Sequence, residues 1–286
     1  MKTAFVFPGQ GSQTVGMGKD LAESLLDQAN QILGFDLKKL CFEGPEEELK
    51  KTEITQPAIL TVSVAAFQQL ATRNPQPATV AGHSLGEYSA LVAAGAIKFG
   101  DAVKIVNLRG KFMQEAVPIG QGAMAAIIGG ERAKIEEVCA GIEGVWPANF
   151  NSPGQIVISG QKEAVEKASA ACKDAGAKRA IPLPVSAPFH CPLMQPAADK
   201  LKMELDKIEV KDATIPVIAN VTAAAVTSAA EIRDLLVKQV TSPVLWEDSV
   251  KKMIADGVSS FVEVGPGKVL SGLIKKIDRN VETSNA

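Results

Sequence analysis

The segment of residues 82–86, Gly-His-Ser-Leu-Gly, carries the strongest signal for covalent chemistry. It follows an apolar run at 78–81 and precedes a helical pattern, and this order of strand, Gly-x-Ser-x-Gly and helix is typical of a nucleophile elbow. Such a turn would expose the Ser84 hydroxyl at the positive end of the next helix. There the main-chain N–H of Leu85 could donate to a developing oxyanion. The alternative is an ordinary glycine-flanked turn with a capping serine.

A nucleophilic serine needs a base, and the chain contains only two histidines. His83 is the neighbour of Ser84, and adjacent side chains on an elbow diverge, so it is badly placed. His190 follows a proline-containing segment, 184–189, that would hold an imidazole beside a cleft. We therefore predict His190 as the general base. A loop histidine with only structural hydrogen bonds is the alternative.

Arg109 lies in a predicted amphipathic helix, 101–116, for which Asp101 could provide the N-cap. At about 100° per residue, Arg109 falls near the centre of the apolar side. A guanidinium directed into a core must meet an anion. That anion is either a structural carboxylate or a substrate carboxylate held by two hydrogen bonds. The residues predicted to form the apolar side are Ala102, Ile105, Val106, Phe112 and Met113, and those predicted to face away are Lys104, Asn107 and Lys111.

A glycine-containing loop at 8–13 follows the first predicted strand. It lacks the Gly-Lys-Ser/Thr of a phosphate loop and the spacing of a dinucleotide motif. Its glycines could allow a backbone N–H to approach Ser84 as a second oxyanion donor.

The elements that must position these residues alternate along the chain. Predicted strands at 3–7, 79–81, 215–220 and 259–264 are separated by helical patterns, among them 58–71, 87–94, 101–116 and 229–240. Short buried strands separated by helices favour a mainly parallel sheet covered on both faces. The fold class is therefore α/β.

The middle of the chain follows another order. It reads as strand 123–129, helix 131–140, a hairpin of strands 145–150 and 155–159, helix 161–175 and strand 178–183. This βαββαβ order is the ferredoxin-like signature. We therefore predict a large domain of residues 1–119 and 188–286, interrupted by a small ferredoxin-like subdomain of residues 120–187.

Composition narrows the possible functions. The net charge of −2 gives no reason to expect binding to nucleic acid or an anionic membrane. No apolar stretch approaches the roughly 18 residues needed to span a bilayer. The first residues read as a strand and turn rather than a signal peptide, so we expect a cytoplasmic protein. Four dispersed cysteines without a CxxC pair indicate reduced thiols and no zinc or other metal site.

Eight segments in order resemble the malonyl-CoA:acyl carrier protein transacylases of fatty-acid synthesis and the related acyltransferase domains of polyketide synthases. The resemblance covers nearly the whole chain and implies a hydrolase-like α/β domain with a ferredoxin-like insert. The segments are residues 7–13, 55–58, 82–86, 109–110 with Met113, 149–154, 188–190, Gln239 with 242–246, and 263–267.

The resemblance also implies residue roles. Ser84 would be the nucleophile and His190 the base, with the main-chain carbonyl of Gln239 orienting the imidazole in place of a triad aspartate. Backbone N–H groups of Gln10 and Leu85 would form the oxyanion hole. The chemistry tolerates the missing aspartate because a coenzyme A thiolate leaves easily.

Substrate selection is implied by three further residues. Arg109 would hold the malonyl carboxylate, and Met113 would contribute to substrate binding. Phe189 resembles the variant associated with malonyl rather than methylmalonyl, since it would crowd the α-carbon. The expected partners are malonyl-CoA and an acyl carrier protein that brings its own phosphopantetheine. The protein itself would need no cofactor and would be a monomer.

Three other functions compete with this interpretation. A serine esterase or thioesterase shares the elbow, but it gains nothing from a buried cation if its acyl chain is neutral. A non-catalytic carrier-binding module would have no reason to retain both Ser84 and His190. A stand-alone acyltransferase serving a polyketide synthase would differ only in the carrier proteins that it accepts.

Overall fold

The structure, a computed structural model, describes residues 2–21, 23–72, 76–185 and 187–286. Its larger sheet has the order β10-β9-β1-β2-β7-β8, and every neighbouring pair is parallel except the last. The mainly parallel sheet predicted from the sequence is confirmed. Its strands are β1 (Lys2–Phe7), β2 (Thr79–Gly82), β7 (Val217–Ile218), β8 (Ala225–Val226), β9 (Val258–Glu263) and β10 (Glu282–Asn285).

Both faces of this sheet are buried, as the continuous apolar strands predict. In β1, Phe5 and Phe7 belong to the core shared with one helical layer, whereas Ala4 and Val6 belong to the core on the opposite face. Helices α11 (Trp246–Ala255) and α12 (Val269–Ile277) cover that opposite face. The first layer holds α1 (Ser24–Leu33), α2 (Leu37–Glu43), α3 (Glu46–Leu49), α4 (Thr52–Ala71), α5 (Gly86–Ala93), α6 (Phe99–Glu115), α9 (Gln195–Leu205) and α10 (Ala229–Thr241), with a short 3₁₀ helix at Pro192–Met194 before α9.

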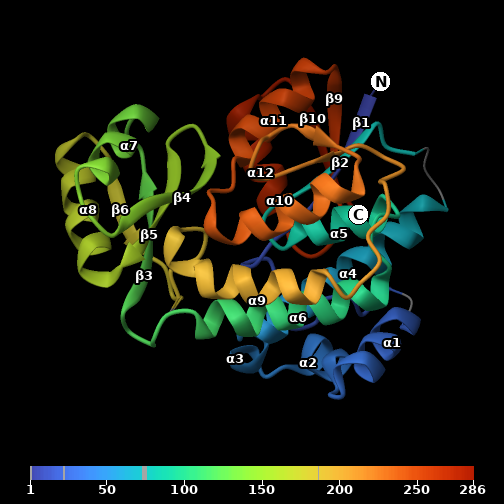
Figure 1. Ribbon diagram of the computed structural model, residues 1–286. Coiled ribbons are helices and arrows are strands. Elements are labelled where there is room, and N and C mark those ends of the chain that lie inside the picture. Colours follow the sequence, from blue (N-terminus) through green and yellow to red (C-terminus); the bar gives the residue numbers. More distant parts are fainter. Residues whose placement is uncertain (1, 22, 73–75, 186) are drawn as a thin grey trace.

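A second sheet, with the order β4-β5-β3-β6, is antiparallel throughout. The connections β3-α7-β4-β5-α8-β6 confirm the ferredoxin-like prediction. This unit has a core of its own and lies beside the larger sheet in Figure 1. Its elements are β3 (Gly122–Ile128), α7 (Arg132–Ala140), β4 (Val145–Ser152), β5 (Gln155–Gln161), α8 (Lys162–Asp174) and β6 (Arg179–Pro182). The domain limits at 119/120 and 187/188 remain a prediction.

The two units are joined beside α11. The Arg132 guanidinium donates to both carboxylate oxygens of Asp248, at 3.0 and 2.9 Å. Main-chain hydrogen bonds link Phe150 N–H to the Val244 carbonyl and Val244 N–H to the Ala148 carbonyl. These contacts hold β4 and α7 against α11 and the residues that precede it.

Three local predictions are wrong. Only Val217 and Ile218 of the predicted strand 215–220 pair in the sheet, and the N–H of Asn220 instead donates to a side chain. Asp101 does not cap α6, because the helix begins at Phe99 and Asp101 falls in its first turn. Asn107 is buried rather than outward-facing, since α6 packs against α1, α4 and α9 together, and its amide donates to the Glu53 carbonyl.

Two expectations from composition have structural counterparts. In the described ranges, no helix combines the length and the apolar character needed to cross a membrane. All four cysteines are buried free thiols, which agrees with the predicted reduced state.

Candidate active site

Ser84 occupies a strained turn between β2 and α5. Its φ of 50° lies in the left-handed region that non-glycine residues seldom adopt. Glycines make the turn possible: a Cβ on Gly82 would lie 1.9 Å from the Gly86 carbonyl carbon, and one on Gly86 would lie 2.0 Å from the Phe7 carbonyl oxygen. The backbone therefore forms the predicted nucleophile elbow.

His190 lies beside the Ser84 hydroxyl, although 106 positions separate them in the chain. Its Nε2 is 2.7 Å from Ser84 Oγ, and its Nδ1 is 2.9 Å from the Gln239 carbonyl oxygen. Because a carbonyl only accepts, Nδ1 must carry the proton, which leaves Nε2 free to accept the serine O–H. The geometry predicted for Ser84, His190 and the Gln239 carbonyl is present.

The His190 imidazole is poised in its neutral form. Burial lowers the pKa of His190 to about 3, and the positive charge of Arg109 adds to this effect. A neutral imidazole with a free Nε2 can take a proton from the serine over the whole physiological range.

His83 has a different environment. Its Nε2 is 2.7 Å from Asn151 Oδ1 at the end of β4, and its ring lies 5.8 Å from that of Trp246. Burial lowers the pKa of His83 as well. The imidazole is thus held by the ferredoxin-like unit and by α11, in agreement with its rejection as the base.

Arg109 reaches Ser84 from α6. Glycine at the next position lets α6 approach α4, since a Cβ on Gly110 would lie 2.6 Å from Glu53 Cα. One terminal nitrogen of Arg109 donates to Gln56 Oε1 at 2.8 Å. The other donates to Gln239 Oε1 at 2.9 Å and to Ser84 Oγ at 3.2 Å.

The charge of Arg109 has no direct counter-ion. Its side chain is 1% exposed, yet within the described residues no carboxylate lies within 4.0 Å of the guanidinium. The structural ion pair considered from the sequence is therefore absent at Arg109 in this part of the chain. Amide oxygens hold the cation, and they leave its charge available to an anion at Ser84.

A cavity of about 130 Å³ opens at Ser84 and brings the predicted site residues together. Of the predicted site residues, Gln239 alone does not line the cavity, but it contacts both His190 and Arg109. Leu85 directly precedes α5, so its N–H is among the donors that a helix start leaves unpaired. The predicted residues that line the cavity are Gln10, Ser84, Leu85, Arg109, Met113, Phe189 and His190.

Three polar residues of the site received no role from the sequence. Asn220 accepts the Ser84 N–H at 2.7 Å and donates to the Gly82 carbonyl at 2.6 Å, so it supports the elbow. Gln56 accepts a hydrogen bond from Arg109, and Glu87 accepts one from the Gln239 side chain. Apolar periodicity gave no signal for these two, because Gln56 follows the polar start of α4 and Glu87 lies in the first turn of α5, where an acidic residue is common.

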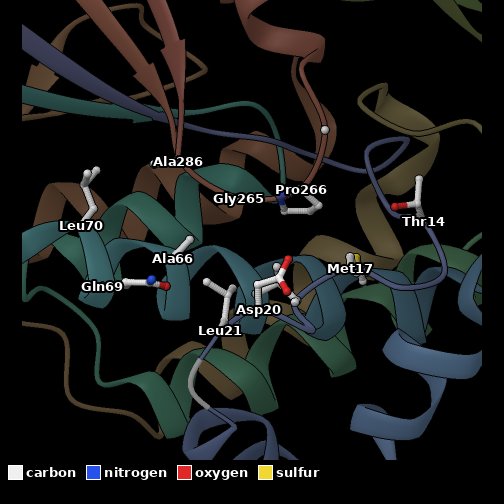
Figure 2. A pocket seen from close by; sticks show the side chains of 13 residues that line it. Thr14, Met17, Asp20, Leu21, Ala66, Gln69, Leu70, Gly265, Pro266 and Ala286 are labelled. Atoms are coloured by element: carbon white, nitrogen blue, oxygen red, sulfur yellow. The ribbon is translucent and has the colours of Figure 1, made fainter.

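A larger cavity of about 470 Å³ lies elsewhere, between α4, the loop after β9 and the loop after β1 (Figure 2). Thr14, Asp20 and Gln69 are the polar side chains among its lining, and none of the predicted site residues lines it. Because this cavity is larger than the one at Ser84, volume does not identify the catalytic site, and the catalytic geometry decides.

The comparisons with known proteins agree with this geometry. The family model described as the acyl transferase domain matches residues 4–285. The malonyl CoA-acyl carrier protein transacylases of Escherichia coli K12 and Bacillus subtilis are 58% and 53% identical, over 96% and 99% of this chain and 92% of each relative. The crystal structure of an acyl carrier protein S-malonyltransferase from Vibrio cholerae has a TM-score of 0.97 at 52% identity, covering 100% of this chain and 97% of that one. The chain therefore belongs to the acyl transferase family, together with these malonyl CoA-acyl carrier protein transacylases.

Proposed function

We propose that this acyltransferase moves malonyl from malonyl-CoA to the phosphopantetheine thiol of an acyl carrier protein, through an ester on Ser84, and so supplies extender units for fatty-acid synthesis. The observation that carries the proposal is the buried Arg109 guanidinium, 3.2 Å from Ser84 Oγ and held only by neutral side chains. A three-carbon acyl group with a terminal carboxylate fits both the charge and the small cavity.

The reaction has two halves. His190 Nε2 takes the Ser84 proton while Oγ attacks the thioester carbon, and the C–S bond then breaks to release coenzyme A, which leaves as a thiolate and collects the proton from the imidazolium. N–H groups of Leu85 and Gln10 would donate to the oxyanion. The carrier thiol then gives its proton to His190 and attacks the ester, and Ser84 recovers its hydroxyl.

Other features follow from this chemistry. Serine, imidazole and thioester supply the nucleophile, base and leaving group, so we infer that the enzyme requires neither a metal nor a resident cofactor. We expect full activity after treatment with a chelator. We also propose a cytoplasmic location and a monomeric state. Analytical sedimentation would test the monomeric state.

A serine thioesterase would use the same elbow and base. The cation at Ser84 opposes this reading, because it stabilises an acyl group that carries a negative charge. A polyketide-serving enzyme has a specific observation in its favour: one similar structure, 50% identical with a TM-score of 0.96 over 100% of this chain and 95% of that one, is a malonyl-transacylase in complex with a type II polyketide acyl carrier protein. Parallel assays with fatty-acid and polyketide carrier proteins would separate the two pathways.

The decisive experiment is mass spectrometry of the intact protein after brief exposure to malonyl-CoA without carrier. We expect one malonyl adduct, located on Ser84 and absent from Ser84→Ala. Addition of carrier protein should transfer the malonyl group, whereas a thioesterase would release free malonate. An adduct that persists in Ser84→Ala, or that maps to a cysteine, would disprove the mechanism.

A further inference from the structure

Glu87 is a buried acid that the mechanism above does not use. It lies in the first turn of α5, three positions after Ser84, and is 3% exposed. Within the described residues no lysine, arginine or histidine pairs with it directly. One of its oxygens, Oε2, accepts the main-chain N–H of Asn220 and the side-chain Nε2 of Gln239, each at 2.9 Å.

The contact between Glu87 and the Gln239 side chain connects the carboxyl to the Arg109 guanidinium. A carboxamide has one donating end and one accepting end. The donating end of Gln239 faces acceptors only: Glu87 Oε2 at 2.9 Å, the Ser84 carbonyl at 3.1 Å and Asn220 Oδ1 at 3.3 Å. Its accepting end therefore faces Arg109, at 2.9 Å. If the Gln239 carboxamide were rotated by about 180°, its N–H donors would face the N–H donors of the Arg109 guanidinium.

The contact between Glu87 and the Asn220 main chain connects the carboxyl to the elbow. Glu87 holds the backbone of Asn220, and the Asn220 side chain bridges the Ser84 N–H and the Gly82 carbonyl. A single carboxyl oxygen thus braces both the residue that would bind the substrate carboxylate and the turn that carries the nucleophile. Burying an acid is costly, and burial raises the pKa of Glu87 to about 7, against the opposing effects of these hydrogen bonds and of Arg109.

We propose that Glu87 is a positioning residue for malonyl selection: it orients the Gln239 amide so that Arg109 stays aimed at the acyl group on Ser84. The proposal rests on the proposed function, since it needs a substrate carboxylate at Arg109. Glu87 touches no reacting atom, and its effect is transmitted through the Gln239 side chain.

Glu87→Met tests this directly, because it keeps the volume and removes both acceptor oxygens. With malonyl-CoA, kcat/KM should fall at least about 10-fold further than with acetyl-CoA, roughly the effect of leaving one buried N–H without its acceptor. Most of the change should appear in KM. Glu87→Gln should stay within about threefold of the wild type, because its amide oxygen can accept the same two N–H groups.

Glu263→Gln is the matched control. Glu263 is also buried and also accepts several N–H groups: the main-chain N–H groups of Leu270 at 3.0 Å and Ser271 at 2.8 Å, at the start of α12, and the side-chain Nδ2 of Asn285 at 3.3 Å. This variant should lower the melting temperature without changing the malonyl-to-acetyl ratio. A purely structural role for Glu87 would give the same pattern as this control.

A double-mutant cycle completes the test. If Glu87 acts through the Gln239 side chain, Glu87→Met and Gln239→Ala should each reduce the malonyl-to-acetyl ratio, and their combination should do little more than either alone. Equal losses for both thioesters in folded Glu87→Met, or additive effects in the cycle, would overturn the proposal. Should Glu87→Met fail to fold, an unchanged ratio in Gln239→Ala overturns it instead. Failure of the wild type to form a malonyl ester would refute the proposed function, which is a separate result.

Discussion

Arg109 offers the sharpest test of substrate recognition, because the site pairs this cation with no carboxylate of the described chain. In Arg109→Ala the malonyl carboxylate would lose its two-pronged partner, and Gln56 and Gln239 would each lose a donor to their side-chain oxygens. Among the described residues that line the cavity, no other side chain carries a full positive charge next to Ser84, since the neighbouring His190 is neutral. The variant thus removes the feature that we propose distinguishes malonyl from acetyl.

The size of the effect follows from burial. The Arg109 side chain is 1% exposed, so water does not screen its contact with an anion. Removing one partner of a desolvated charge pair costs on the order of 2–5 kcal/mol. This corresponds to a fall of roughly 30-fold to several thousand-fold in malonyl transfer. Arg109→Lys should recover only part of the loss, because one ammonium group cannot bridge Gln56 and Gln239 while it also grips a carboxylate.

The assay compares kcat/KM for malonyl-CoA and acetyl-CoA in folded Arg109→Ala, with melting temperature as the check on folding. Acetyl transfer, weak in the wild type, should stay level or rise once the unpaired cation is gone. If both thioesters lose the same factor, Arg109 supports the architecture of the site and does not read the substrate.

Other predictions address the base, the buried acid and the elbow. His190→Ala should slow acylation at least ~10²-fold, whereas His83→Ala should keep more activity; equal losses in two folded variants would reverse the assignment. Because the pKa of His190 is lowered to about 3, kcat/KM for malonyl-CoA should stay flat from about pH 7 to 5, and a decline with a midpoint near 6.5 would contradict this. Because the pKa of Glu87 is raised to about 7, its contribution to stability is complete below pH 4.5 and is lost as the pH rises through about 7. Chemical denaturation should therefore show the free energy of unfolding of the wild type falling by up to roughly 3 kcal/mol relative to Glu87→Gln over that range. A constant difference between the two proteins would refute the shift. Gly86→Ala should abolish soluble folded protein or displace the elbow, because the added Cβ would lie 2.0 Å from the Phe7 carbonyl oxygen. An active and equally stable variant would show that the turn can relax.

Local patterns predicted much of the fold. The elbow and the individual strands and helices of both units were each predicted within one short segment, because glycine spacing, apolar periodicity and turn residues act over short distances. The strand at 215–220 was predicted too long for the same reason: its apolar pattern continues, but the main-chain N–H of Asn220 donates to Glu87 and not to a neighbouring strand.

By itself, the sequence determined that Ser84 would stand on a strained turn, that His190 was the better of two possible bases, and that Arg109 would be buried. It left open which anion Arg109 meets, because a helical period reports only that a side chain points inward. The tertiary structure brings three neutral acceptors around the guanidinium instead of a carboxylate: Gln56 from α4, Gln239 from α10 and Ser84. Those partners lie 53, 130 and 25 positions away, and only the packing of helices on the sheet sets such separations in space.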